Sequence, residues 1–167
     1  MSEDLQRLVD EQARVMGVQS MPVKTENKGS AATDRVNIFV NPSFASSVMS
    51  SAGSNGMRFV LAHELAHARA GCPGGHSGEL AADRWATRSL VRAGIDMEPV
   101  DKVMAMLHGP ATKSHPGSTE RAENARSEWQ ARAGVRRPRK PARESLQAAP
   151  RTTKKHVKVH PNKFRER

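Results

Sequence analysis

Five consecutive residues, His63 to His67, read His-Glu-Leu-Ala-His and directly follow an apolar run at positions 59–62. An apolar run that follows turn residues is typical of the start of a buried helix. Side chains at positions i and i+4 share one face of a helix, so His63 and His67 can present two imidazole nitrogens to one zinc ion. Glu64, beside the first histidine, can act as a general base toward a metal-bound water. The segment therefore predicts a helix over residues 56–70 that carries a zinc site.

A catalytic zinc site needs a third protein ligand besides the two histidines. The metzincin pattern would place a glycine three residues and a histidine six residues after His67, but Ala70 and Pro73 occupy those positions and exclude it. His76 and Cys72 are chemically able to bind a metal. Both lie in a Gly/Pro-rich segment, where an exposed loop histidine and an inert thiol are the simpler interpretations.

Glu79 is the favoured third ligand, because it begins a helix predicted over residues 78–93 that can pack against the first helix. A carboxylate there completes a His-His-Glu site, the arrangement of gluzincins. The alternative is an acidic residue stabilised by the helix N-terminus. Asp83 lies one turn later on the same face. There it can hydrogen-bond the free ring nitrogen of a ligand histidine and fix its tautomer, although it could also be an exposed helix carboxylate.

The remaining pattern predicts further helices and a small sheet. Residues 35–41 are rich in β-branched and aromatic side chains and form the best strand of the chain. Weaker signals predict helices at 2–16, 97–108 and 119–133, a strand near 18–23, a polar loop at 25–33 and a helical turn at 43–50. We therefore expect an α+β fold that is mostly helical.

The positive charge of the chain is concentrated near its C-terminal end. The 167 residues have a formal net charge of +10. Residues 1–131 hold 14 basic and 15 acidic residues, whereas residues 132–167 hold 13 basic and 2 acidic residues. Interleaved prolines and the loss of hydrophobic periodicity predict that residues 135–167 are disordered. We expect one domain, residues 1–134, followed by this basic tail.

The basic tail predicts a polyanionic partner, with nucleic acid as the favoured class. Lys and Arg contact phosphates without regard to sequence, and only Phe164 could stack on a base. An anionic lipid surface, a nuclear address in a eukaryote and a solubilising extension are the alternatives. The candidate nucleic-acid-binding residues are Arg136, Arg137, Arg139, Lys140, Lys154 and Lys155.

No signal for export or membrane insertion is found in the sequence. The N-terminal segment is acidic and amphipathic, unlike a signal peptide. No apolar stretch approaches the ~20 residues needed to cross a bilayer. Cys72 is the single cysteine, so no intramolecular disulfide can form. We therefore expect a cytoplasmic protein.

Four motifs, in order along the chain, resemble the HtpX-type and CAAX-prenyl-protease-type zinc metallopeptidases. They are His-Glu-Leu-Ala-His, Glu-Leu-Ala-Ala-Asp-Arg-Trp-Ala, Leu-Val-Arg-Ala-Gly-Ile-Asp and Ser-His-Pro-Gly-Ser-Thr-Glu-Arg. The resemblance extends from about Val36 to Ala125. It implies a zincin-like gluzincin core with one Zn2+ per chain. The implied ligands are His63, His67 and Glu79, with Glu64 as the base.

The same resemblance implies roles for residues further along the chain. His115 would lie near the metal, where it could stabilise the oxyanion or cap the zinc in a resting state. Arg121 would hold Asp83 or the adjoining loop. The strand at 35–41 would be an edge strand beside the zinc that pairs with an extended substrate. The chain departs from membrane-embedded members in lacking transmembrane segments, so it resembles a minimal soluble core.

These observations predict a zinc-dependent endopeptidase. The alternative from another class is a non-catalytic zinc-scaffold protein that attaches to nucleic acid or another polyanion through its tail. Glu64 argues against that alternative, because a structural zinc site has no use for a general base. A third interpretation is a regulatory protease that cuts a DNA-bound repressor or another nucleic-acid-associated protein.

Overall fold

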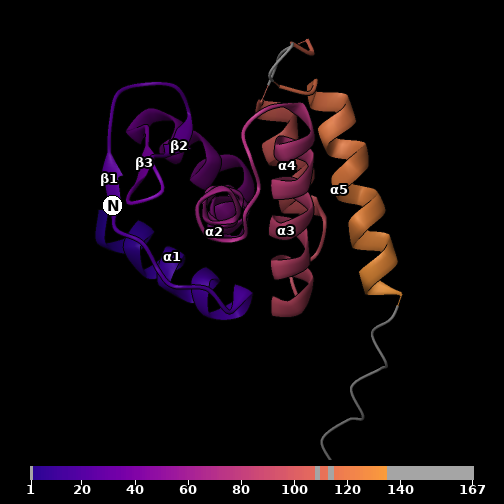
Figure 1. Ribbon diagram of the computed structural model, residues 1–167, viewed down its shortest axis with the longest axis horizontal. Helices are drawn as coiled ribbons and strands as arrows, with labels where there is room; N and C mark the ends of the chain where they lie inside the picture. Colours follow the sequence, from indigo (N-terminus) through magenta and orange to yellow (C-terminus); the bar gives the residue numbers. More distant parts are fainter. Residues whose placement is uncertain (1, 108–109, 113–114, 135–167) are drawn as a thin grey trace, which may run out of the picture. The chain divides into compact units, whose positions relative to one another are not determined.

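The computed structural model describes residues 2–107, 110–112 and 115–134, all of which belong to one compact unit, Met1–Arg136. Its elements, in chain order, are α1 Ser2–Met16, β1 Val23–Thr25, β2 Ala31–Thr33, β3 Ile38–Val40, α2 Pro42–Arg69, α3 His76–Ala93, α4 Glu98–Met106 and α5 Ser118–Ala133 (Figure 1). The predicted α+β class, mostly helical with a small sheet, is confirmed. Among these helices, none has the length and apolar character that a membrane span requires.

Helix α2 is the central element of the fold. It packs against α1, α3, α4 and strands β2 and β3, and Figure 1 shows it between the sheet on one side and α3 to α5 on the other. Asn41 caps its start by accepting hydrogen bonds from the backbone N–H groups of Ser43 (2.9 Å) and Phe44 (3.3 Å). The helical turn predicted at 43–50 and the helix predicted at 56–70 are both parts of α2.

A break inside α2 separates its two parts. Gly53 has φ 65° and ψ −168°, which are not helical angles. Glycine adopts positive φ at little cost, so the chain can change direction here. Beyond the break, every residue from Met57 to Ala66 except Arg58 is buried. The part of α2 that carries the His-Glu-Leu-Ala-His motif thus lies in the core.

The three strands form one sheet in the order β1-β3-β2. β1 pairs with β3 in parallel, and β2 pairs with β3 in antiparallel register, so that Thr33 lies opposite Ile38. Ile38 and Val40 are fully buried, because β3 is the central strand. The prediction of an edge strand at 35–41 is therefore wrong in two respects. The strand covers only Ile38–Val40, and the edge strands are β1 and β2.

Helix α5 is joined to α3 mainly through polar side chains. Ala125 is the only residue of α5 that is buried. Arg88 donates two hydrogen bonds to Glu128, at 2.6 and 3.3 Å. Asn124 accepts a bond from Arg84 (2.9 Å) and donates one to the carbonyl of Leu80 (2.9 Å). These contacts fix the middle of α5 beside α3.

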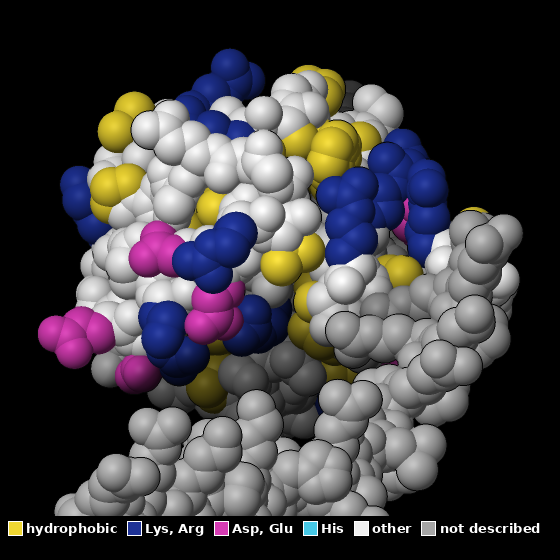
Figure 2. Space-filling view, turned by 90° about the horizontal axis from the view of Figure 1, so that it is seen from below, with side chains coloured by type: hydrophobic (Ala, Val, Ile, Leu, Met, Phe, Trp, Pro, Cys, Tyr) yellow, Lys and Arg dark blue, Asp and Glu magenta, His cyan; other side chains and the backbone are white. Residues whose placement is uncertain are grey.

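Basic and acidic side chains lie next to each other on the face shown in Figure 2. Ion pairs of this exposed kind join Arg7 to Glu11 (3.3 Å) and Arg126 to Asp101 (2.9 Å). Such pairs contribute about 0–1 kcal/mol each. The mixture of signs agrees with the near-neutral charge of residues 1–131.

Candidate active site

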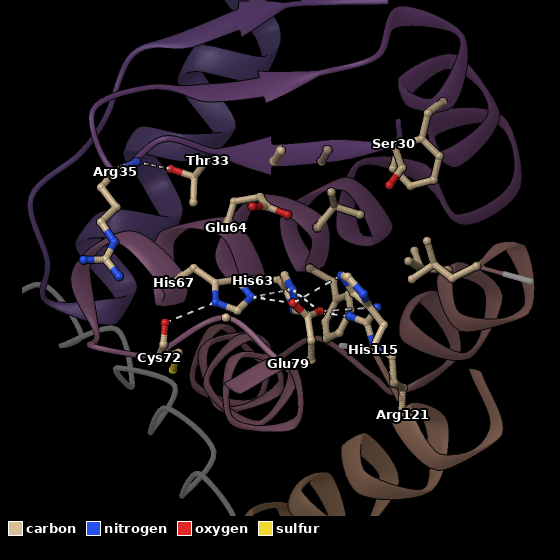
Figure 3. Close-up of a pocket in the computed structure, with 18 residues that line it drawn as sticks. Ser30, Thr33, Arg35, His63, Glu64, His67, Cys72, Glu79, His115 and Arg121 are labelled. Atoms are coloured by element: carbon tan, nitrogen blue, oxygen red, sulfur yellow. Dashed lines mark hydrogen bonds and ion pairs between the residues drawn. The ribbon is translucent and has the colours of Figure 1, made fainter. Parts of the chain in front are cut away.

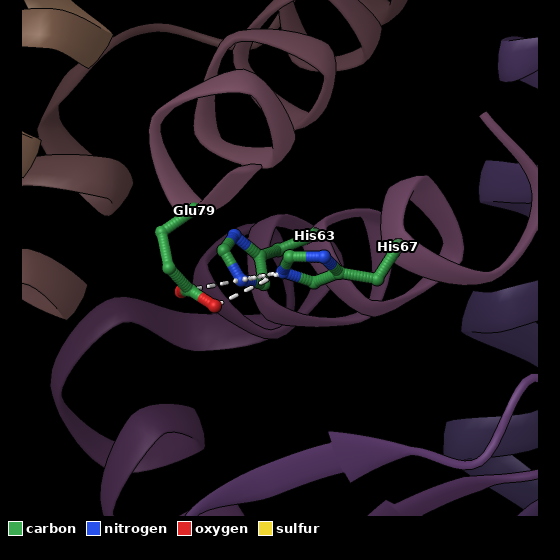
Figure 4. Close-up of side chains that lie close together, drawn as sticks. All are labelled: His63, His67 and Glu79. Atoms are coloured by element: carbon green, nitrogen blue, oxygen red, sulfur yellow. Dashed lines mark hydrogen bonds and ion pairs between the residues drawn. The ribbon is translucent and has the colours of Figure 1, made fainter. Parts of the chain in front are cut away.

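Three side chains from two helices converge at one point (Figure 4). The Nε2 atoms of His63 and His67, both on α2, are 3.1 Å apart. Each lies 3.3 Å from a carboxylate oxygen of Glu79 on α3. Ligands at about 2.0–2.1 Å from a tetrahedral zinc are separated by about 3.3 Å from one another. The observed distances therefore fit a single zinc ion bound between the three groups.

The outer ring nitrogens of both histidines have hydrogen-bond acceptors. Nδ1 of His63 lies 2.8 Å from Oδ1 of Asp83, and Nδ1 of His67 lies 3.2 Å from the carbonyl oxygen of Cys72. In the neutral rings, acceptors at Nδ1 favour the tautomer with its proton there, which leaves the Nε2 lone pair able to bind a metal ion. This is the usual outer support of metal-binding histidines.

The electrostatics of this cluster favour a positive charge. Burial lowers the pKa of His63, but hydrogen bonds to Asp83 and Glu79 outweigh burial and raise it to about 9. Burial raises the pKa of Glu79, whereas its bonds with His63 and His67 lower it well below the usual range. Without metal, a proton on His63 satisfies this demand at neutral pH. A divalent cation could also supply this positive charge, because it can contact all three groups at once.

Arg121 brings helix α5 into the site. It donates two hydrogen bonds to Asp83, from Nε (2.8 Å) and Nη2 (2.7 Å), and its Nη1 lies 3.8 Å from Glu79. Burial raises the pKa of the Asp83 carboxyl, but the bonds from Arg121 and His63 lower it below its usual value. Asp83 is therefore held as a charged acceptor toward His63. The contact between Arg121 and Asp83 is the one that the resemblance implied.

Glu64 faces a cleft of about 360 Å³ beside the three converging side chains. In Figure 3, its carboxylate lies between the two histidines and strand β2. The residue is 8% exposed, and within the described residues no hydrogen bond to its carboxylate is found. Burial raises the pKa of Glu64. A carboxylate in this state can accept a proton from a molecule in the cleft.

His115 lies at the rim of the same cleft. Its Nε2 is 4.0 Å from Oε1 of Glu79, and its side chain is 64% exposed. In Figure 3, it lies on the side of the site nearest Arg121. This position agrees with the neighbourhood that the resemblance implied, while the role of His115 stays a prediction.

The two alternative ligands do not join the cluster. His76 begins α3 and lies 2.9 Å from Glu120 of α5. The Cys72 thiol is buried, which raises its pKa, and Cys72 contributes to the site through its backbone carbonyl. Within the described residues, the group that could hold a metal ion consists of His63, His67 and Glu79.

Several parts of the cleft could not be found from sequence. Strand β2 lies in the segment predicted as a polar loop, and it lines the cleft together with Arg35. The lining of the cleft also includes the apolar residues Phe44, Val60, Val103 and Leu107. The only signal for these residues is hydrophobicity, which predicts burial and does not indicate a binding surface.

The comparisons with known proteins found no relative. No protein-family model, no curated protein and no solved structure matches the chain. The resemblance to zinc metallopeptidases therefore rests on its motifs. The six candidate nucleic-acid-binding residues, from Arg136 to Lys155, lie outside the described residues.

Proposed function

We propose that this protein is a zinc-dependent endopeptidase. The observation that carries the proposal is the convergence of His63, His67 and Glu79 beside a cleft into which Glu64 projects. Three protein ligands that leave a position open are typical of catalytic zinc sites, whereas structural sites use four. The alternative of a non-catalytic scaffold gives no role to a buried carboxylate in the cleft.

Zinc bound by His63, His67 and Glu79 would supply a Lewis acid that lowers the pKa of water and polarises a carbonyl group. Glu64 accepts a proton from the attacking water while the water oxygen forms a bond to the carbon of the scissile carbonyl group. The same carboxyl then donates that proton to the leaving amine as the C–N bond breaks. His115 at the rim can donate a hydrogen bond to the oxyanion.

Strand β2 offers a place for the substrate backbone. It is an edge strand paired on one side with β3, and its three residues line the cleft. An extended peptide can add to a free strand edge through main-chain hydrogen bonds, whatever its side chains. This supports a polypeptide as the substrate. From the sequence, we expect residues 35–41 to pair with the substrate, whereas the structure places β2 at the sheet edge beside the cleft.

The proposal is tested with purified full-length chain, an unfolded protein such as reduced casein, and bound zinc measured by mass spectrometry. We expect cleavage by the zinc-loaded chain, loss of cleavage after chelation, and recovery on adding zinc back. His63→Ala and Glu79→Ala should lose both metal and cleavage. A chain that binds no zinc, or that cuts casein equally well after chelation, would contradict the proposal.

A further inference from the structure

Arg35 has a backbone conformation that is unfavourable for its residue type. Its φ is 71°, and it is the only residue other than glycine with positive φ in the described part of the chain. A bulky residue is strained in this region, because its Cβ crowds the backbone. Glycine or asparagine would fit the turn between β2 and β3 with less strain. The arginine side chain therefore gives the turn no conformational advantage.

The turn is held firmly by the residues on either side of Arg35. The Asp34 carboxylate accepts hydrogen bonds from the backbone N–H groups of Val36 (2.8 Å) and Asn37 (2.6 Å) and from the Asn37 side chain (3.2 Å). The hydroxyl of Thr33 accepts a bond from the backbone N–H of Arg35 (3.0 Å). Within the described residues, no ion pair joins this carboxylate to the neighbouring guanidinium of Arg35.

The guanidinium of Arg35 lies on the cleft and has no partner among the described residues. Arg35 lines the cleft, and Figure 3 shows it beyond Thr33, on the side of His67 and Cys72. Among residues 2–107, 110–112 and 115–134, no hydrogen bond or ion pair of this guanidinium is found. The other arginine of the cleft, Arg121, is bound to Asp83. Arg35 is therefore the arginine of the cleft that is available to an incoming anion.

We infer that Arg35 is a specificity residue that binds an acidic side chain of the polypeptide substrate, an inference that rests on the proposed endopeptidase function. Arg35 follows the C-terminal end of β2, two residues after Thr33. A peptide that adds to β2 in the antiparallel direction, the slightly more stable pairing, reaches Arg35 with its N-terminal part. The preferred Asp or Glu therefore lies on the N-terminal side of the cleaved bond, within a few residues of it.

The first experiment maps the cleaved bonds. Zinc-loaded wild-type chain digests a mixture of peptides derived from whole-cell protein, and mass spectrometry identifies the new termini. We expect Asp and Glu to be enriched at one position N-terminal to the cleaved bonds. Digestion without enrichment at any such position would overturn the inference and leave the proposed function standing. A wild-type chain that cuts no peptide would overturn both.

The second experiment assigns the preference to Arg35. Two synthetic peptides differ only in Glu or Gln at the enriched position, and the measured quantity is the ratio of their kcat/KM values. An exposed ion pair corresponds to a ratio of about fivefold in the wild type. Arg35→Gln should bring the ratio to about one, and Arg35→Glu should invert it by charge repulsion.

A matched control removes a positive charge elsewhere. Arg92, on α3, is exposed and does not line the cleft, so Arg92→Gln should retain the wild-type ratio. Added salt should lower the wild-type ratio and leave that of Arg35→Gln unchanged, because salt screens exposed charges. If Arg35→Gln keeps the wild-type preference for Glu, the inference is wrong, even though cleavage itself persists.

Discussion

Nδ1 of His63 lies 2.8 Å from Oδ1 of Asp83, a side chain with no solvent exposure that comes 20 residues later in the chain. Arg121 donates one bond to each oxygen of the same carboxylate, from Nη2 to Oδ1 and from Nε to Oδ2. A histidine supported in this way has a set ring orientation and a set tautomer before any ligand arrives. The geometry of the candidate metal site therefore depends on a residue that need not contact the metal.

Replacing Asp83 with Asn should weaken zinc binding by about 10–100-fold, the usual effect of losing the outer partner of a ligand histidine. The amide keeps the size of the side chain but removes its charge toward His63 and Arg121. Competition with a chromophoric chelator at neutral pH measures the affinity. Asp101→Asn is the matched control, because Asp101 forms an exposed ion pair with Arg126. Equal affinity in Asp83→Asn and the control would contradict the role given to Asp83.

Glu64→Gln should retain zinc and the fold but lose turnover by about 10²–10⁴-fold, the range expected for a general acid–base group. Glutamine keeps the shape of the side chain, but it cannot accept the proton. The measurements are kcat/KM on an unfolded protein, bound zinc, and the unfolding temperature. Undiminished activity in this variant would exclude Glu64 as the base.

Gly78→Ala should destabilise the chain and disturb the site. A Cβ at this position would lie 1.7 Å from the carbonyl oxygen of Pro73, so the backbone must move. Overpacking of this kind costs about 1–3 kcal/mol, and Glu79 is the next residue. Thermal unfolding and zinc affinity measure the two effects. In Gly74→Ala, the added Cβ would meet nothing within 4 Å, so this variant should behave like the wild type.

The ion pair between Arg88 and Glu128 should make α5 sensitive to acid. Burial raises the pKa of Glu128, but hydrogen bonds from Arg88 and Arg132 lower it below its ordinary value of 4.5. A carboxyl group whose pKa is lowered by folding stabilises the folded state at pH values above its pKa in the unfolded chain. This stabilisation is lost as the pH falls through the pKa of the folded state. Glu128→Gln should therefore cost about 1 kcal/mol at pH 7. The difference from the wild type should shrink at more acidic pH.

Urea unfolding of the wild type and Glu128→Gln at pH 7 and at about pH 3 checks this dependence. Glu120→Gln is the control, because Glu120 pairs at the surface of the same helix with His76. A difference between the wild type and Glu128→Gln that grows toward acidic pH would show that the assignment is wrong.

Local pattern was sufficient to predict the helices. The apolar run before His63 and the amphipathic spacing of residues 2–16 are properties of single segments, and both helices are observed. The i and i+4 spacing also brought His63 and His67 to one face, as expected. Local pattern did not show that the helical turn at 43–50 and the helix at 56–70 belong to one element, α2, which runs from Pro42 to Arg69 across the non-helical Gly53.

Strand β2 and the order of the strands in the sheet could not be predicted from local sequence. Ala31–Thr33 is a strand because it pairs with β3, and its small side chains give no period of two. Whether a strand is central or at an edge depends on which segments pair with it, so residues 35–41 were misplaced at the edge. For the same reason, the sequence does not show that Arg35 lines the cleft, because its position depends on the turn between the paired strands β2 and β3.

Arg121 is the last residue of the chain, among those described, to join the candidate site, and it comes 58 positions after His63. During synthesis on a ribosome, His63, His67 and Glu79 emerge first, while Asp83 still lacks its guanidinium partner. The site is therefore fully supported only after α5 has emerged and docked. Under the proposed endopeptidase function, a newly made chain would therefore gain full metal binding, and with it activity, only once the last helix of its domain has been synthesised.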